Sequence, residues 1–480
     1  MTQGPADSAA TAAPLTFHGG VAGALAPFLL FLGGVGALAL QGAPDEKGFW
    51  PVLLAALTLG LLLAHDRTRY AEAMLDGMSQ RMVMVMVCAW LLAGVLGAVL
   101  GAAGFVDALA WAARRLALSG GAYVAAAYLA CVVVSMATGT SFGTILLCGP
   151  LLYPAGGAAG AHPGVLMGAI LAGATVGDSL SPVSDTTIAS AGTQRMDIGG
   201  TVRARLPYAA TAGTVALVAA WALGGRATQA TAGALVPLPD ARPQALLLLL
   251  APALVIGALL RRRHLIEALL LGNLAAVLLA LALRLLPPGA LLHVAPGTFG
   301  ATGVVLEGMQ RAVGVIVFTL LLVALVGTVQ ATDLLERLVA WAEGRARTTR
   351  AASAWIVAVV SWAVLLTTHS VVAILATGEF ARRTGERCAV DGYRRANLLD
   401  LTVCTWPFVL PYFLPTILAA SATQGGAAHG MPVLGAWEVG RYNFYAWAVA
   451  GVVLWMVVGA GGRAGADDTR RPASSQMGEG

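Results

Sequence analysis

The chain changes character at Gly173-Ala-Thr-Val-Gly177-Asp178-Ser-Leu-Ser181-Pro182-Val-Ser184-Asp185-Thr186-Thr187. Residues 116–177 contain no Asp, Glu, Lys or Arg, and then two carboxylates and several hydroxyls arrive together. An ionised carboxylate is unfavourable at membrane depth unless something compensates its charge, so its presence there indicates a functional site. The stretch therefore predicts a binding site for a cation or a proton.

The same stretch predicts a broken helix. Gly173, Gly177 and Pro182 all disfavour an uninterrupted helix, and the proline also releases the carbonyl groups that precede it. Carbonyls, carboxylates and hydroxyls are the oxygen ligands that hard cations prefer. Transporters use such unwound segments near the middle of the bilayer to hold a coupling ion.

The composition is that of an integral membrane protein. Of the 480 residues, 58% are hydrophobic and 11% charged, with a mean hydropathy of +0.78, whereas soluble domains carry about 25% charged residues. The net charge of +5 is explained by basic loops facing the cytoplasm, and no basic stripe interleaved with aromatics suggests nucleic acid. The five cysteines are scattered, which argues against a disulfide framework or a zinc site, and we expect no cofactor.

Apolar runs place most of the chain in the membrane. A spanning helix needs roughly 20 predominantly apolar residues. The runs that approach this length are 21–40, 49–64, 82–104, 121–137, 141–155, 164–177, 206–224, 244–260, 266–283, 313–330, 353–377, 398–422 and 442–460. We expect an all-α polytopic membrane protein with about 10–13 membrane segments and discontinuous helices. The transmembrane domain would cover 21–460, between polar tails at 1–20 and 461–480.

Two basic loops make the topology of one run ambiguous. Arginines at 337–350 and at 382–395 flank the apolar run 353–377. Basic loops favour the cytoplasmic side, and one simple span cannot place both of these loops there. Either the run folds back on itself, or one basic loop faces outward.

An internal repeat is also indicated. The segment 138–146 resembles 367–375 at an offset of 229, and the same offset carries Pro182 onto Pro411. If the match is real, the halves are about 82–225 and 313–460, each with a hydroxyl-rich break followed by a helix that a proline interrupts. Inverted-repeat transporters are built in this way, with the site between the halves.

Asp178 and Asp185 are the first candidate ligands. Their spacing of seven would put both on one face of a continuous helix, although Pro182 between them changes the geometry. In the alternative interpretation, Asp178 or Ser184 only caps a helix start. Neither carboxylate can be ranked above the other from the sequence.

Thr140 and Ser141 lie in the upstream hydroxyl-rich segment Thr138-Gly139-Thr140-Ser141-Phe-Gly143-Thr144. They could supply oxygen ligands where the glycines let the backbone unwind, or the small residues could serve helix packing. A third reading makes Ser141 a nucleophile, with His369 as its base, because Gly139-Thr-Ser141 faintly resembles the serine site of rhomboid-type intramembrane proteases.

The second half holds further candidates. Asp400 and Thr405 precede Pro407, Pro411 and Pro415, which prevent a regular helix. Asp400 could serve transport, or it could pair at the interface with the neighbouring Arg394 and Arg395. His369 and Ser370 could coordinate an ion or relay protons, or His369 could be a packing residue.

Two motifs carry a family resemblance. Gly177-Asp178-Ser-Leu-Ser181-Pro182-Val-Ser184-Asp185-Thr186-Thr187 resembles the Gly-Asp-x-x-Ser-Pro-x-Ser-Asp-Thr-Thr signature of the NhaC family of sodium/proton antiporters, within the ion transporter superfamily. The segment from Thr138 to Thr144 resembles the Thr-Gly-Thr-Ser-x-Gly-Thr segment upstream in that family. The chain departs from the family at Thr368 and His369, where Asn or Gly is expected.

The resemblance implies sodium/proton antiport across a bacterial-type cytoplasmic (inner) membrane. Asp178 would bind either a proton or sodium, with Ser181, Ser184, Asp185, Thr186, Thr140 and Ser141 completing the shell. Sodium, protons and the lipid bilayer are the expected partners, and a homodimer is compatible with the sequence.

Two other functions stay open. Some members of the family exchange malate and lactate, which would require an anion site, and Arg284 is the one isolated arginine identified inside an apolar run. An intramembrane protease is the remote alternative, either of the serine type described above or of the aspartyl type, whose Gly-x-Gly-Asp resembles Thr175-Val-Gly177-Asp178.

Overall fold

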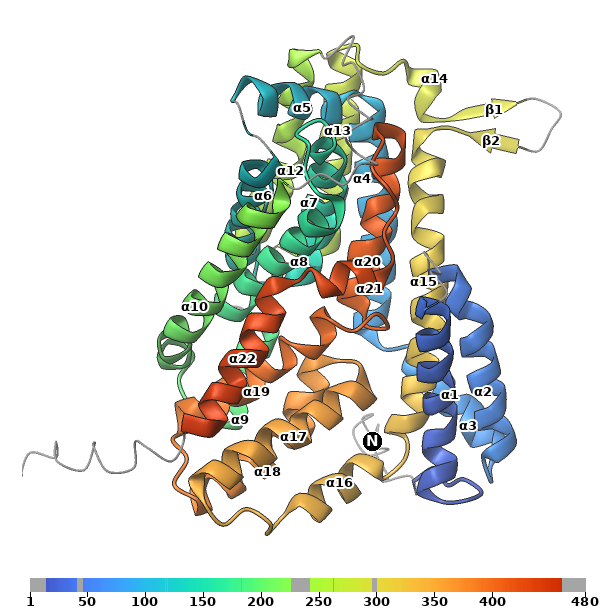
Figure 1. The fold of residues 1–480 in the computed structure, drawn as a ribbon. Coiled ribbons are helices and arrows are strands. Elements are labelled where there is room, and N and C mark those ends of the chain that lie inside the picture. Colours follow the sequence, from blue (N-terminus) through green and yellow to red (C-terminus); the bar gives the residue numbers. More distant parts are fainter. Residues whose placement is uncertain are drawn as a thin grey trace, which may run out of the picture.

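The computed structural model describes residues 14–459 apart from 41–45, 117, 119, 183, 226–241, 262 and 296–299. Within these residues, nine helices are long and apolar enough to cross a membrane, and three shorter apolar helices accompany them. The only strands in this described part are β1 (His293–Ala295) and β2 (Gly300–Thr302), which pair antiparallel in a short hairpin at one end of the molecule (Figure 1). The predicted all-α polytopic membrane fold is confirmed.

The described residues of the first half of the chain form ten α-helices and one short 3-10 helix, η1 (Glu46–Phe49). The α-helices are α1 (Val21–Leu40), α2 (Trp50–Leu63), α3 (Arg67–Met78), α4 (Arg81–Ala102), α5 (Phe105–Arg115), α6 (Gly120–Thr138), α7 (Ser141–Gly156), α8 (Pro163–Leu180), α9 (Asp185–Thr193) and α10 (Ile198–Gly224).

The second half begins with a connecting group, η2 (Pro243–Leu249), α12 (Leu250–Leu260), α13 (Leu265–Ala282) and α14 (Pro288–Leu291). It continues with α15 (Val304–Gln330), α16 (Leu334–Ala342), α17 (Thr349–Thr367), α18 (Ser370–Arg387), α19 (Gly392–Val403), η3 (Trp406–Phe408), α20 (Leu414–Ala422), η4 (Thr423–His429), α21 (Ala436–Arg441) and α22 (Phe444–Val458).

The two halves repeat at the offset that the sequence indicated. Adding 229 to the bounds of α6 gives those of α17, and adding 229 to those of α9 gives those of α20. The unusual backbone conformations repeat as well, since φ is +71° at Gly139 and +51° at Thr368, and +68° at Gly160 and +53° at Ala389. The two repeats therefore share their backbone conformation, although few of their side chains are the same.

The repeats cross over one another. Figure 1 shows α7 and α20 towards one end of the molecule and α9 and α18 towards the other. In agreement, α9 packs against α18 of the second repeat, and α20 packs against α7 of the first. This is the arrangement of an inverted repeat, in which equivalent helices approach the centre from opposite sides.

Each repeat contains a helical hairpin with its tip inside the protein. In the first, the hydroxyl of Tyr123 near the start of α6 donates to the carbonyl oxygen of Leu152 near the end of α7 (2.7 Å). In the second, Thr349 at the start of α17 donates to the carbonyl oxygen of Cys388, which follows α18 (2.8 Å). The run 353–377 therefore folds back on itself, and both basic loops lie at the same end of the molecule.

The break in the organising stretch lies later than Gly173 and Gly177 suggested. Helix α8 continues to Leu180, and α9 begins at Asp185 beyond Pro182. Both glycines instead face α6, because a Cβ on Gly177 would come within 2.4 Å of the Cβ of Ser135. These glycines serve close helix packing, and the proline makes the break.

The structure describes only a part of the two predicted tails, 1–20 and 461–480. Residues 461–480 and 1–13 lie outside the described residues. Leu15 and Phe17, which fall within the expected tail 1–20, are buried against Tyr70 and its neighbours. The packed domain thus begins before residue 21.

Candidate functional site

The hairpin tips and the broken helices meet around a cavity of about 310 Å³. Its lining includes Thr140 and Ser141 from the first tip, His369 and Ser370 from the second, and Asp178, Ser184, Asp185 and Thr186 from the break between α8 and α9. The structure thus brings together eight candidate residues that are far apart in the sequence. The remaining wall is mostly apolar and includes Trp90 of α4 and Leu265 of α13.

Asp178 is the buried carboxylate of this cavity. It lies in the last turn of α8 and is 9% exposed. Its Oδ2 accepts a hydrogen bond from Ser141 Oγ (2.9 Å), and its Oδ1 accepts one from Ser184 Oγ (2.6 Å). Both hydroxyls stabilise the charged carboxylate and place further oxygens beside it.

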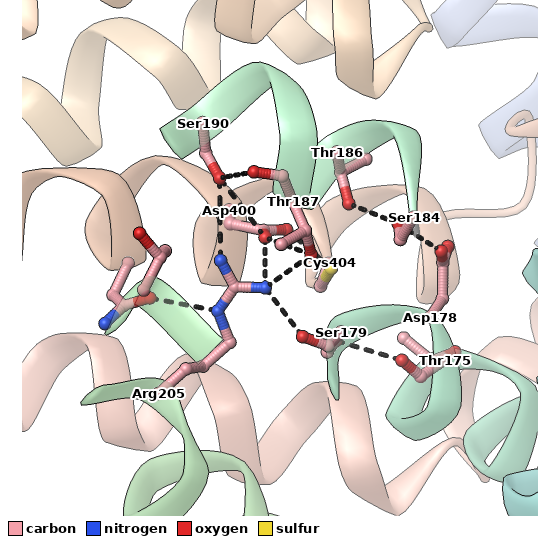
Figure 2. A network of polar contacts seen from close by, with 12 residues as sticks. Thr175, Asp178, Ser179, Ser184, Thr186, Thr187, Ser190, Arg205, Asp400 and Cys404 are labelled. Carbon is pink, nitrogen blue, oxygen red and sulfur yellow. Dashed lines mark hydrogen bonds and ion pairs between the residues drawn. The ribbon is translucent and has the colours of Figure 1, made fainter. Parts of the chain in front are cut away.

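Asp185 and Thr186 follow on the other side of the break. Asp185 opens α9 and is exposed, whereas Thr186 is buried with its Oγ1 3.1 Å from Ser184 Oγ. Figure 2 shows Asp178, Ser184 and Thr186 as one polar chain along the break. The two acids are therefore ranked by their environment, because Asp178 is enclosed and held by hydroxyls while Asp185 is open.

Helix ends point their backbone groups at the same cavity. Helix α7 begins at Ser141, where Thr140 Oγ1 accepts from the backbone N–H of Gly143 (3.4 Å), and α18 begins at Ser370. Helices α6 and α17 end at Thr138 and Thr367, on the opposite side of each tip. Free N–H groups and free carbonyls at such ends interact with anions and cations respectively.

Two polar atoms at the tips are buried without a partner. They are Oγ1 of Thr138 and Nδ1 of His369, and both residues line the cavity. Among the described residues, no group of three or more His, Cys, Asp or Glu side chains is arranged to hold a metal ion. The oxygen atoms available to a cation here come from one buried carboxylate, hydroxyls and backbone, a set suited to a weakly held hard cation.

Three further candidate residues, Ser181, Thr405 and Asp400, are not among the lining residues of the cavity. Ser181 Oγ donates to the carbonyl oxygen of Met136 (3.0 Å), which ties the break to α6. Thr405 Oγ1 donates to the carbonyl oxygen of Leu401 (3.0 Å), one turn earlier. Asp400 is fully buried and does not line the cavity, but it accepts a hydrogen bond from Cys404, which does.

Asp400 pairs with Arg205 of α10, and both side chains are 0% exposed. Neither Arg394 nor Arg395, the neighbours suggested by the sequence, is its ionic partner in the described structure. Arg205 also donates to Asn397 Oδ1 (3.0 Å). Figure 2 shows its further bonds to the carbonyl oxygen of Ser179 (2.6 Å) and to Thr187 Oγ1 (2.9 Å). The cluster joins the end of α8 to α9, α10 and α19.

The sequence reasoning missed Arg205. It stands one residue before the apolar run 206–224 and so outside every predicted membrane segment, while Arg284, the arginine considered instead, is exposed. The structure shows that α10 extends from Ile198 through Arg205 without interruption, which places this arginine on the helix. The buried arginine is neutralised by Asp400, so it does not create an anion site.

The geometry does not support a serine nucleophile. Ser141 Oγ donates to Asp178, and no described hydrogen bond connects it to His369. A base must lie within hydrogen-bonding reach of the hydroxyl that it activates.

Part of this chain resembles known antiporters. Residues 22–224 match the model of the Na+/H+ antiporter family. Over 233 residues the chain is 30% identical to the Na(+)/H(+) antiporter NhaC of Alkalihalophilus pseudofirmus, which covers 48% of this chain and 50% of that protein. Over 166 residues it is 29% identical to the Malate-2H(+)/Na(+)-lactate antiporter of Bacillus subtilis, which covers 34% of each chain.

A third relative is an uncharacterized protein of Haemophilus influenzae, 43% identical over 84 residues, or 17% of this chain and 16% of that protein. The chain thus matches half or less of the length of each of these relatives. The resemblance indicated by the two motifs is confirmed. Residues 22–224 of this membrane protein, which contain the first hairpin and Asp178, are thus similar to the Na+/H+ antiporter family.

Proposed function

We propose that this protein exchanges sodium for protons across the cytoplasmic membrane, with Asp178 as the coupling carboxylate. The observation that carries the proposal is the position of Asp178, which is enclosed at a helix break between the two hairpin tips and accepts hydrogen bonds from Ser141 and Ser184. The family match of residues 22–224 supports the same function.

One carboxylate is sufficient to enforce exchange. Sodium needs the ionised form of Asp178, with Ser141, Ser184 and Thr186 as neighbouring oxygens, and a bound proton removes that charge. The two cargoes therefore exclude each other at this residue. The inverted repeats supply two equivalent ways of opening, so access alternates when one repeat rocks against the other.

The basic loops orient the protein in the membrane. The hairpin of α17 and α18 brings the arginines at 337–350 and 382–395 to one end, and the positive-inside rule assigns that end to the cytoplasm. In Figure 1 this is the end with α16 and α18, while α5 and α14 lie at the other end. Cytoplasmic sodium would leave towards the α5 end, and external protons would enter from it.

The test uses everted vesicles that hold a pH gradient. Added sodium should dissipate the gradient with the wild-type protein, should fail to do so with Asp178→Asn, and should act more weakly with Asp185→Asn. Asp76→Asn is the matched control, because Asp76 is an exposed acid on α3 outside the cavity. A full sodium response in Asp178→Asn would show that the coupling site lies elsewhere.

Organic-acid exchange is the second candidate. The cavity of about 310 Å³ exceeds what one ion occupies and reaches the size of small-molecule sites, and one relative is named a malate/lactate antiporter. Against it, no Lys or Arg belongs to the described lining of the cavity, while two acids do. Dissipation of the gradient by malate, with no response to sodium alone, would establish this candidate and refute sodium/proton exchange.

A further inference from the structure

A second cavity, of about 70 Å³, adjoins the central one. The two cavities share two lining residues, Trp90 of α4 and Leu146 of α7. Trp90 is 2% exposed, so its side chain is buried where it lines both cavities. The cavities are therefore neighbours that share an apolar wall.

Three helices show where the second cavity leads. Helix α4 lines the central cavity with Met86 and the second with Gly97, and α20 lines them with Leu414 and Ser421 respectively. Along α7 the order is the same, from Ser141 at the hairpin tip to Pro150 in the second cavity. All three helices thus continue from the central site into the second cavity, away from the hairpin tip.

The second cavity lies towards the end opposite the basic loops. Its other residues come from η4 and from the early part of α15, including Gln424 and Arg311. The start of α15 adjoins the β1–β2 hairpin, which Figure 1 shows at the end far from α16 and α18. By the orientation given above, that end is the external one.

We infer that the second cavity is the external access route of the central site, and that Trp90 with Leu146 forms the gate between them. A narrow apolar wall excludes ions because it offers no oxygen to replace their water, which is how hydrophobic constrictions gate channels. The inference deepens the proposed function by naming a gate for the same site.

Arg311 places a positive charge on the external access route. Its side chain is exposed and lines the second cavity, where a fixed guanidinium lowers the local concentration of cations. The external mouth would therefore resist the re-entry of sodium while leaving the cytoplasmic approach unaffected. Arg311 is a specificity-determining residue of the route and makes no contact with the central site.

Thiol labelling tests the gate without relying on transport. In a variant whose five native cysteines are replaced, Val371→Cys reports on the central cavity and Ser421→Cys on the second. A membrane-impermeant thiosulfonate added outside intact cells should label Ser421→Cys quickly. It should label Val371→Cys slowly, and adding Trp90→Ala should raise that rate by about tenfold or more, while Trp90→Phe should not.

The labelling has clear contrary outcomes. The inference fails if Ser421→Cys reacts only from the cytoplasmic face, or if Trp90→Ala leaves the labelling of Val371→Cys unchanged. Because labelling does not depend on which solute is carried, a failure of sodium/proton exchange in vesicles would leave this result interpretable.

A second measurement uses the protein with its native cysteines. Arg311→Gln should lower the external sodium concentration that half-maximally drives reverse exchange by about threefold, with the cytoplasmic half-saturation unchanged. Arg311→Lys should behave as the wild type, since it keeps the charge. The assignment of Arg311 would be overturned if the half-saturating sodium concentration changed equally on both faces of the membrane, or changed on neither.

Discussion

The guanidinium of Arg205 on α10 and the carboxylate of Asp400 on α19 form an ion pair from which water is excluded, since both side chains are 0% exposed. Helix α10 belongs to the first repeat and α19 to the second, so the pair joins the two halves. Thr187 and Asn397 satisfy further hydrogen-bonding groups of the guanidinium. A buried pair that is fully hydrogen-bonded is retained at little net cost, whereas half of one is strongly unfavourable.

Replacing one partner of this pair should destabilise the protein more than replacing both. Asp400→Asn leaves a buried arginine without its counter-charge and should cost about 3–5 kcal/mol, whereas Arg205→Met combined with Asp400→Leu should cost less than Asp400→Asn alone, because no charge is left buried without a partner. Thermal unfolding of the purified protein, followed by size-exclusion chromatography, measures this. Additive losses would show that the pair does not act as a unit.

The two serines of the break should affect different properties, Ser184 the affinity for sodium and Ser181 the stability of the protein. Ser184→Ala removes a hydrogen bond to the charged carboxylate of Asp178, worth about 1.5–3 kcal/mol, so the sodium concentration for half-maximal exchange should rise about tenfold or more. Ser181→Ala removes the bond to the carbonyl oxygen of Met136, which ties the break to α6, and should lower stability while leaving that concentration unchanged. Vesicle assays over a sodium series compare them, and equal shifts in both variants would place Ser181 in the ion site.

The left-handed backbone conformation occurs at equivalent positions of the two repeats, so glycine and alanine can be exchanged at both and the change in stability compared. Ala389 has a φ of +53° where the first repeat has Gly160, and a side chain is disfavoured in that left-handed region. Ala389→Gly should stabilise the protein by about 0.5–1 kcal/mol, and Gly160→Ala should destabilise it by about 1–2 kcal/mol. No atom lies within 4 Å of a Cβ built on Gly160, so a loss of stability there reports on the backbone alone.

The close approach of α6 and α8 should not tolerate a methyl group. Gly177→Ala would bring a Cβ to 2.4 Å from that of Ser135, so overpacking should cost about 1–3 kcal/mol. Gly192→Ala is the matched control, because nothing lies within 4 Å of its Cβ, and alanine there should gain up to about 1 kcal/mol. Unfolding temperatures of the two variants should move in opposite directions.

A contact between the repeats at the end of the molecule that carries the basic loops should depend on pH. Tyr393 of α19 donates to Asp197, the residue that caps α10, and this bond together with the Gly200 N–H lowers the pKa of Asp197. The same bond raises the pKa of Tyr393. Its contribution to stability is therefore lost as the pH falls through the lowered pKa of Asp197, and again as the pH rises through the raised pKa of Tyr393.

The comparison of wild type with Tyr393→Phe measures that contribution. Their difference in unfolding temperature should be constant near neutral pH and should shrink below the ordinary aspartate value of 3.8 and above the ordinary tyrosine value of 10.0. A difference that does not vary with pH would mean that the hydroxyl acts by packing rather than through Asp197.

The sequence alone was sufficient for the local features of this protein. Apolar runs of sufficient length predicted the membrane helices, because hydropathy acts on each segment independently. Pro182 placed the break before Asp185, and the offset of 229 located the second repeat, whose helix bounds follow it. The two hydroxyl-rich motifs identified six residues that the structure places around one cavity, and the repeated segment 367–375 added His369 and Ser370.

Only the tertiary structure decided which distant groups meet. Arg205 and Asn397 are 192 residues apart, and no local pattern links α10 to α19. Ser181 and Ser184 belong to one motif, yet the packing of α6 turns the first towards Met136 while the second reaches Asp178. The folding back of 353–377 depended likewise on the pairing of α17 with α18. Spacing and hydropathy constrain a segment, whereas the partner of a buried charge is set by the packing of helices far apart in the chain.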